Sequence, residues 1–250
     1  TLARAGRAED AAALTALAVG LARAAAAGAD PAGDAVLVAG SAPPLEDCYR
    51  PDLVPDAAAL AREHAEHAGN LAASGVDLVL CETLNSVREA AAAAAAARAS
   101  GLPFLVSFVC GPGGRLLSGE PLARGVEAVA GLGPEALLVN CLPPRDADAC
   151  LPVLAGSGLP FGVYANLGAP AEPGGTGWQC EETPDAFAAA AGSWLARGAR
   201  LVGGCCGTGP AHIRALARRI AAARSRTACF CAVLTLTREP HDDHRGQKAQ

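Results

Sequence analysis

The sequence predicts an α/β protein built on a parallel barrel of the (β/α)8, or TIM, type. Short apolar runs alternate with longer helical stretches, and the runs start about 25 to 40 residues apart, which leaves room for a crossover helix between parallel strands. The runs are near-continuous in Val, Leu, Phe and Ala, as expected for strands buried on both faces. No Gly-x-Gly-x-x-Gly motif follows the first run, so an ordinary dinucleotide-binding sheet is disfavoured.

Six strands are expected, and most of them end on a polar or thiol side chain. In a closed parallel barrel the catalytic groups lie at the carboxyl ends of the strands. We therefore expect these end residues to gather at one rim: Ser41, Glu82 with Thr83, Cys141, Asn166, and Cys205 with Cys206. The expected strands are residues 36–41, 76–83, 103–110, 136–141, 161–166 and 200–206.

Helices fill the gaps between these runs. Asp56 follows a proline and is placed to cap the second helix, and Ser86 is the corresponding candidate for the third. Gly101 is the stop signal of that third helix. The expected helices are residues 9–27, 56–74, 86–100, 122–130, 146–155, 183–197 and 210–224.

The length of 250 residues suits one large domain, which we expect over residues 1–224. Residues 225–250 do not fit the pattern, because they follow the helix that should close the domain and end in a polar, histidine-bearing stretch. A late strand is one interpretation of this tail. A poorly ordered or non-native extension is favoured.

Composition narrows the function classes. Hydrophobic residues make up 51% and charged residues 18%, which indicates a globular protein with a large core. Aromatic residues are scarce at 4% and the net charge is −5, so a nucleic-acid partner is not expected. No run of about 20 strongly apolar residues and no signal peptide are evident, which predicts a cytoplasmic protein with no membrane partner. The oligomeric state is left open.

The cysteines indicate a metal site. Ten cysteines in a chain of this length without a signal indicate a reducing compartment and metal-binding thiols. Cys205 and Cys206 follow an apolar run and precede a glycine-rich turn, and Cys141 ends a similar run. If both runs are parallel strands of one sheet, three sulfurs converge. Three thiolates with a free fourth position are typical of catalytic zinc, whereas structural sites use four ligands. Three other cysteines are expected to be small buried hydrophobes: Cys81, Cys110 and Cys150.

Other interpretations stay open at this point. The pair Cys205-Cys206 is also compatible with a vicinal dithiol used in redox chemistry, or with two buried cysteines without function. His64 and His67 lie three residues apart on one helical face, where a metal site is less favoured than a solvated surface. His212 is expected to make a local polar contact.

The motifs resemble those of the zinc-dependent homocysteine S-methyltransferases, over roughly residues 36–223. The resemblance rests on Val139-Asn140-Cys141, on Gly203-Gly204-Cys205-Cys206-Gly207-Thr208, and on residues 75–83 ending in Cys-Glu-Thr. Ser107-Phe108 followed by Ser118-Gly119-Glu120, and Tyr164-Ala165-Asn166 before a glycine-rich loop and Trp178, add weaker support. The double-cysteine motif is the specific part.

The resemblance implies roles for individual residues. Cys141, Cys205 and Cys206 correspond to the three ligands of Zn²⁺, and Glu82 to the carboxylate that holds the amino group of homocysteine. Thr83, Ser107 and Asn166 are candidates to line the substrate pocket, with structural roles in strand-end hydrogen bonding as an equally favoured alternative. A helix-start carboxylate facing solvent is the alternative for Glu82.

The implied reaction moves a methyl group from a sulfonium donor, S-methylmethionine or S-adenosylmethionine, to the thiol of homocysteine and gives methionine. The expected partners are thus a small thiol amino acid and a methyl donor. A betaine-dependent or other thiol methyltransferase, and a non-catalytic zinc- or thiol-binding degenerate barrel, are the alternatives. Residues 1–34 lack the family's first strand and its Asp-Gly-Gly turn, so we expect a barrel without its first two strands.

Overall fold

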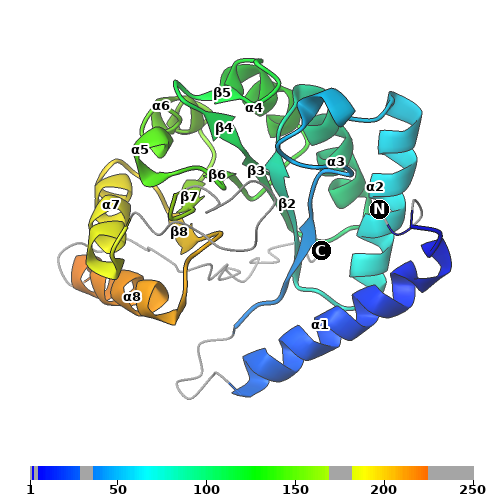
Figure 1. Cartoon of the computed structure of the whole chain (residues 1–250), viewed down its shortest axis with the longest axis horizontal. Coiled ribbons are helices and arrows are strands. Elements are labelled where there is room, and N and C mark those ends of the chain that lie inside the picture. Colours follow the sequence, from blue (N-terminus) through cyan, green and yellow to red (C-terminus); the bar gives the residue numbers. More distant parts are fainter. Residues whose placement is uncertain (1, 3–4, 29–35, 169–181, 225–250) are drawn as a thin grey trace, which may run out of the picture.

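The computed structural model describes residues 2, 5–28, 36–168 and 182–224. The expected tail at 225–250 lies outside the described residues. Within them the sheet is parallel, as predicted, and its six strands follow the order β1-β2-β3-β6-β7-β8 with β1 and β8 at the edges. Figure 1 shows the sheet curled into part of a barrel, with the helices around its outer side. The strands are β1 (Ala39–Ala42), β2 (Leu78–Leu84), β3 (Phe104–Phe108), β6 (Ala136–Asn140), β7 (Phe161–Ala165) and β8 (Leu201–Gly204).

The helices follow the predicted positions closely. Asp56 caps α2, since its carboxylate accepts a hydrogen bond of 2.9 Å from the Ala59 backbone N–H. Ser86 is at the cap position of α3, but its side chain makes no capping hydrogen bond. The α-helices are α1 (Ala11–Gly28), α2 (Ala57–Ala73), α3 (Val87–Ala99), α4 (Leu122–Ala130), α5 (Pro144–Ala147), α6 (Leu151–Ala155), α7 (Pro184–Ala196) and α8 (Pro210–Arg224), with 3₁₀ turns η1 (Ala8–Asp10) and η2 (Pro51–Leu53).

Two segments differ from the sequence prediction. The single helix expected over 146–155 is wrong, because α5 and α6 are separate short helices there. Pro152 lies in the first turn of α6, and a proline has no N–H to carry a helix through from the preceding turn. The strand expected over 103–110 ends at Phe108. The next residues form a hairpin of β4 (Cys110–Gly111) and β5 (Arg115–Leu116), whose strands are too short to leave a pattern.

Strand alternation sorts the core into two layers. The outer face of the sheet packs against the helices through residues such as Val79, Val139 and Val202. The inner face forms a smaller cluster around Leu78, Leu105 and Leu138. The predicted burial of both faces is confirmed for the inner strands β3 and β6. It is wrong for the edge strand β1, where alternate residues are exposed. Cys81, Cys110 and Cys150 are buried, also as expected.

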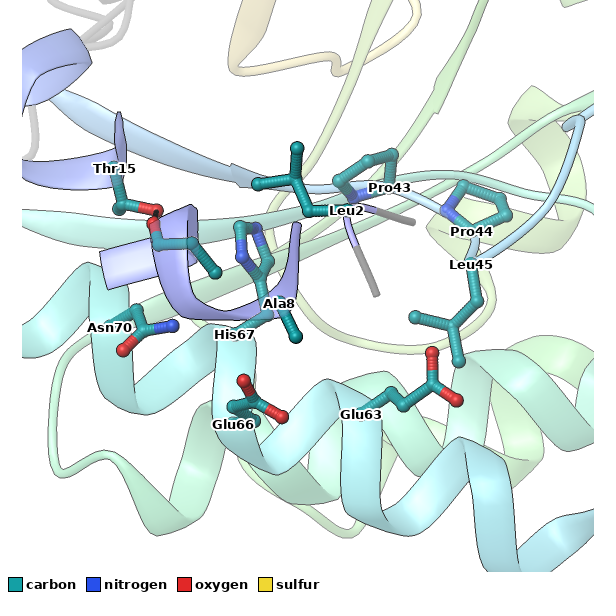
Figure 2. A pocket seen from close by; sticks show the side chains of 11 residues that line it. Leu2, Ala8, Thr15, Pro43, Pro44, Leu45, Glu63, Glu66, His67 and Asn70 are labelled. Atoms are coloured by element: carbon teal, nitrogen blue, oxygen red, sulfur yellow. Dashed lines mark hydrogen bonds between the residues drawn. The ribbon is translucent and has the colours of Figure 1, made fainter. Parts of the chain in front are cut away.

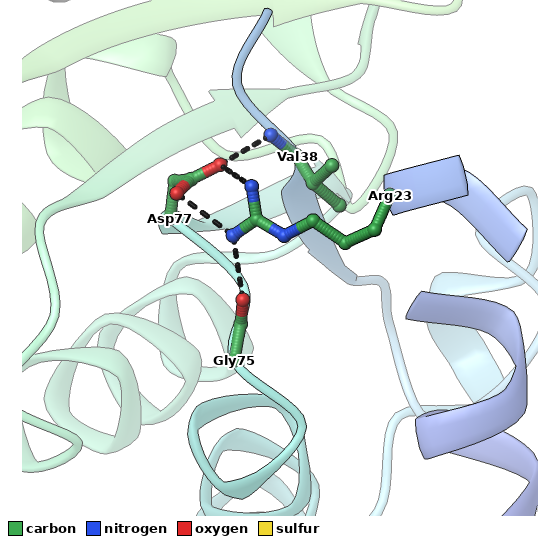
Figure 3. Close-up of polar contacts among 4 residues, drawn as sticks. All are labelled: Arg23, Val38, Gly75 and Asp77. Carbon is green, nitrogen blue, oxygen red and sulfur yellow. Dashed lines mark hydrogen bonds and ion pairs between the residues drawn. The ribbon is translucent and has the colours of Figure 1, made fainter. Parts of the chain in front are cut away.

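Helix α1 borders the edge strand β1 and is joined to the sheet by one polar cluster (Figure 3). The Arg23 guanidinium donates hydrogen bonds of 2.6 and 2.8 Å to the two carboxylate oxygens of Asp77 and one of 2.6 Å to the Gly75 carbonyl. Asp77 also accepts from the Val38 N–H at 2.6 Å. The segment Ala8–Gly28 is long and apolar enough, by length and composition alone, to cross a membrane. In this fold α1 packs beside α2.

We expect Arg23→Ala to lower the free energy of unfolding by about 1 kcal/mol, the upper range for a partly exposed ion pair with good geometry. The hydrogen bond from Arg23 holds the pKa of Asp77 below its usual value. A carboxyl group with a depressed folded pKa stabilises above its unfolded pKa of about 3.9, and that contribution is lost as the pH falls through the folded pKa. Urea unfolding at pH 7 and at pH 3 measures the difference, which should shrink in acid.

Arg124→Ala is the matched control for this experiment. Its pair with Glu127 has both side chains about 70% exposed, at 70% and 69%, so its loss should change stability little at either pH. An equal loss for both arginine variants, or a difference that persists at pH 3, would contradict the assignment of Arg23–Asp77 as the connection between α1 and the sheet.

Candidate metal centre

Three cysteines meet at the carboxyl end of the sheet. Cys141 follows β6, and Cys205 and Cys206 follow β8, with β7 between the two strands. The Cys141 and Cys206 sulfurs lie 3.7 Å apart and the Cys205 and Cys206 sulfurs 3.9 Å apart, and all three lie within 4.8 Å of one another. The convergence predicted from parallel strand ends is therefore present. It is the one group of three or more His, Cys, Asp or Glu ligand atoms this close among the described residues.

The sulfur positions fit a tetrahedral thiolate metal. A Zn–S bond of about 2.3 Å with tetrahedral angles places neighbouring sulfurs about 3.8 Å apart. The two separations of 3.7 and 3.9 Å match that spacing. Cys141 is buried and the other two cysteines are half-buried, so the cluster lies at the rim of the sheet and not in its core. The soft sulfur donors suit zinc among the divalent metals.

Local sequence sets this geometry. The Cys205 N–H donates to the Ala165 carbonyl and the Leu167 N–H to the Cys206 carbonyl, so the cysteine turn continues the contact between β7 and β8. The Thr208 hydroxyl closes the turn by donating to the Cys205 carbonyl at 2.7 Å. A Cβ on Gly204 would lie only 2.4 Å from that hydroxyl oxygen. The glycine before the cysteine pair is therefore required for the turn to close.

The three thiols share their protons unequally. The hydrogen bond from Cys141 lowers the pKa of Cys205 to about 6. The same hydrogen bond, with burial, raises the pKa of Cys141. Burial and the neighbouring Cys205 charge raise the pKa of Cys206. Close packing of three thiols thus favours one thiolate and resists three, which is the situation that a divalent cation relieves.

Asn140 connects the cysteines to the neighbouring strands. Its side-chain oxygen accepts hydrogen bonds from the Thr83 N–H at 3.0 Å and from the Ser107 hydroxyl at 2.7 Å. Its side-chain nitrogen donates to the Thr83 hydroxyl at 2.8 Å and to the Cys205 sulfur at 3.9 Å. The amide is fully buried, and all four of its hydrogen-bonding positions are used.

Two non-glycine residues of this site have left-handed backbones. Thr83 has φ of 61° and Cys141 has φ of 57°. This conformation is unfavourable for residues with a Cβ, above all for a β-branched one, and such strain clusters at functional sites. Asn140 holds Thr83 in place through both its backbone and its hydroxyl.

Glu82 lies on the inner face of β2, beside this network. Its carboxylate accepts a hydrogen bond of 2.5 Å from the Ser41 hydroxyl and one of 3.1 Å from the Tyr164 hydroxyl. Burial, and then the Glu82 charge, raise the pKa of Tyr164, so the phenol stays protonated as the donor. The carboxylate is therefore oriented by neighbours on β1 and β7 and does not extend freely into solvent.

The three candidates for the lining of the pocket are also at or near strand ends. Ser107 is buried on β3 and is committed to Asn140, and Thr83 belongs to the same network. Asn166 is buried after β7, where its side-chain oxygen accepts from the Gly168 N–H at 3.3 Å. Whether these three side chains line a substrate pocket stays a prediction.

Sequence reasoning missed the roles of three side chains of this site: Tyr49, Asn140 and Tyr164. Asn140 had a signal, because a lone amide in an otherwise apolar strand needs buried partners. Tyr164 had a weaker signal, because strand alternation places it on the inner face of the sheet. Tyr49 had none, because it lies on a loop whose path the sequence does not define.

The histidines differ in part from expectation. The solvated face predicted for His64 is wrong: this side chain is 2% exposed, and its ring nitrogen lies 3.4 Å from the buried Glu89 carboxylate. Helix α2 packs this face against α3. His67 contacts the Ser41 carbonyl at 2.8 Å. His212 makes the expected local contact, accepting from the Gly209 N–H at 3.2 Å.

A separate cavity of about 340 Å³ lies between the N-terminal residues, the segment after β1 and helix α2 (Figure 2). Pro43, Pro44 and Leu45 form its apolar wall, and Glu63 and Glu66 of α2 its acidic one. None of the three clustered cysteines lines it. The cavity is thus distinct from the metal centre.

Comparisons with known proteins agree with this site. The family model described as homocysteine S-methyltransferase matches residues 1–220, beginning ahead of residue 36, where the motif resemblance starts. The homocysteine S-methyltransferase of Escherichia coli (strain K12) is 35% identical over 208 residues, which are 76% of this chain and 64% of that protein. The homocysteine S-methyltransferase 4 of Zea mays is 34% identical over 158 residues, 60% of this chain and 46% of that protein. The chain thus spans about half to two thirds of the length of these relatives.

The solved structures give the same result. The metallated form of the homocysteine methyltransferase MmuM from Escherichia coli superposes with a TM-score of 0.69 at 33% identity, over 83% of this chain and 70% of that chain. Its apo form also has a TM-score of 0.69, at 31% identity, over 84% and 75% of the two chains. That protein has a metallated form, and the three-sulfur cluster of this chain is a ligand set of the kind that holds a metal.

Proposed function

Because this chain belongs to the homocysteine S-methyltransferase family, we propose that it transfers a methyl group to the thiol of homocysteine at a zinc site held by Cys141, Cys205 and Cys206. The observation that carries the proposal is the convergence of three sulfurs within 4.8 Å, with two separations of 3.7 and 3.9 Å that match tetrahedral thiolate ligation. Three protein ligands leave a fourth position for the substrate sulfur. The reaction forms the S–CH₃ bond of methionine and breaks the S–CH₃ bond of the sulfonium donor, which leaves as a neutral thioether. The thiol proton of homocysteine is released to solvent.

Zinc, when bound, supplies a Lewis acid that keeps a coordinated thiol deprotonated at neutral pH, where a free thiol with a pKa near 8.5 is mostly protonated. The chain's own contribution is the charge and position of its ligands. Three thiolates outnumber the two positive charges of the metal and give a net −1 centre. Such a centre attracts a cationic methyl donor and repels an anionic one.

The amino-acid part of the substrate is assigned to the Glu82 side of the site. A carboxylate oriented by the Ser41 and Tyr164 hydroxyls is suited to bind the ammonium group of homocysteine through charge-assisted hydrogen bonds. We assign Thr83, Ser107 and Asn166 to the lining of the same pocket. Thr83 connects to Cys205 through Asn140, so the amino-acid and metal parts of the site share one hydrogen-bond network.

A sulfonium, S-methylmethionine or S-adenosylmethionine, is the donor that the anionic centre favours. Betaine, a quaternary ammonium, shares the positive charge and is the alternative donor. We assign the reaction to the cytoplasm, because seven free cysteines among the described residues require a reducing compartment.

The proposal is tested by incubating zinc-loaded full chain with homocysteine and each of the three donors and measuring methionine. We expect methionine with at least one sulfonium and none after the zinc is removed with a chelator. Metal uptake without methyl transfer from any donor would favour the non-catalytic zinc-binding alternative. Retention of full activity after zinc removal would contradict the proposal.

A further inference from the structure

Tyr49 lies on the segment between β1 and α2, and three hydrogen bonds fix that segment to the start of α3. The Leu45 N–H donates to the Glu89 carboxylate at 2.8 Å, and the Asn85 side chain donates to the Cys48 carbonyl at 3.0 Å. Farther along, the Arg88 guanidinium donates to the Val54 carbonyl. The backbone is therefore anchored on both sides of Tyr49, and its ring is not placed by chance.

The Tyr49 hydroxyl lies 3.1 Å from the Cys141 sulfur, within hydrogen-bond distance. Tyr49 is 48% exposed, so its ring lies at the surface of the site and the hydroxyl reaches inward. The direction of this hydrogen bond follows from the chemistry of a metal ligand. A coordinated cysteine has lost its proton, whereas a phenol with a pKa near 10 keeps its proton at neutral pH. With a metal bound, Tyr49 is the donor and the sulfur of Cys141 the acceptor.

We infer that Tyr49 is a positioning residue of the metal centre, which donates its phenolic hydrogen to the Cys141 thiolate and holds that ligand in its coordinating orientation. The inference rests on the proposed function. Cys141 has a left-handed backbone at φ 57°, which is energetically unfavourable. A hydrogen bond to its sulfur helps to offset that cost and to hold the sulfur in position. A hydrogen bond to the sulfur also withdraws electron density from it, and so lowers the negative charge that the three thiolates donate to the metal.

Tyr164 provides a matched comparison, since these two are the only tyrosines in the chain. Its hydroxyl donates to Glu82 at 3.1 Å, on the side of the site assigned to the amino acid, and not to one of the clustered sulfurs. Removing either hydroxyl leaves a phenylalanine of nearly the same shape. The two substitutions should therefore act on different halves of the site.

The experiment compares zinc affinity, by competition with a chromophoric chelator, in the wild type, Tyr49→Phe and Tyr164→Phe. We expect Tyr49→Phe to bind zinc about 10-fold more weakly, the lower range for loss of a partner of a metal ligand. Tyr164→Phe should keep the wild-type zinc affinity. In the Co²⁺-loaded proteins, the sulfur-to-metal charge-transfer band of Tyr49→Phe should move to longer wavelength, because a sulfur without its hydrogen bond gives up electrons more easily.

Equal zinc affinity and an unchanged cobalt spectrum in Tyr49→Phe would overturn the inference. So would a tyrosinate absorption that appears on zinc binding and is missing in Tyr49→Phe, since the phenol would then be a ligand and not a donor. If the wild type takes up no zinc, both the inference and the proposed function fail. If the wild type binds zinc and Tyr49→Phe binds it equally, only the inference fails.

Discussion

Cys206→Ala should abolish methyl transfer and weaken zinc binding by at least about 100-fold, since loss of outer partners of a metal ligand alone costs 10- to 100-fold. The sulfurs of Cys141 and Cys205 would remain, and two thiolates bind a divalent cation more weakly than three. The removed sulfur lies 3.7 and 3.9 Å from the other two, so it is a full member of the cluster. Zinc content after dialysis and the rate of methionine formation are the measurements.

Thermal unfolding gives a second measure of the same change. Metal that binds only the folded state stabilises it by mass action, so zinc should raise the midpoint temperature of the wild type and not of Cys206→Ala. Cys81→Ala is the control, because that thiol is fully buried on the outer face of β2 and away from the cluster. It should lose stability and keep both zinc and turnover. Undiminished zinc content and turnover in Cys206→Ala would refute the metal assignment.

Glu82→Gln should raise the KM for homocysteine by about 30- to 1,000-fold while zinc content stays at the wild-type level. The substitution keeps the shape of the side chain and removes the charge that is proposed to pair with the substrate ammonium. Loss of one partner of a buried charged pair costs about 2–4 kcal/mol, and each 1.4 kcal/mol is tenfold. Steady-state kinetics with homocysteine as the varied substrate measure the effect.

Glu135→Gln is the matched control for this variant. Glu135 is exposed and precedes β6, at the edge of the sheet opposite the cysteines, so its charge should not affect KM. Loss of zinc from Glu82→Gln would show that the carboxylate supports the metal and not the substrate. An unchanged KM would contradict the assignment of Glu82 to the substrate ammonium.

The sequence predicted the sheet well because its signals are local. Most strands of the sheet are apolar runs long enough to recognise, while β1 follows directly after the apolar residues 36–38. Asp56 caps α2 by the rule that identified it. The hairpin at 110–116 and the break at Pro152 were missed for a physical reason. Strands of two residues carry no periodicity, and a proline early in a helix is equally compatible with one helix that starts there and with a kink in a longer one.

The site was predictable where it depends on strand ends and not where it depends on loops. Cys141, Cys205 and Cys206 end parallel strands, and parallel strands bring their carboxyl ends to one edge. The contacts of Asn140 required the register between β2, β3 and β6, which pairs residues far apart in sequence. Tyr49 reaches Cys141 across 92 positions of the chain through an irregular segment, and no pattern in the sequence encodes that path.

The amide of Asn140 has a thermodynamic consequence for the two ligands. One side-chain nitrogen contacts both the Cys205 sulfur and the Thr83 hydroxyl, and Thr83 is adjacent to Glu82. A cation that immobilises Cys205 therefore also immobilises the amide and, through it, the backbone beside the carboxylate that would receive the amino acid. If the proposed zinc tightens the binding of homocysteine through this amide, linkage requires homocysteine to tighten the binding of zinc by the same factor.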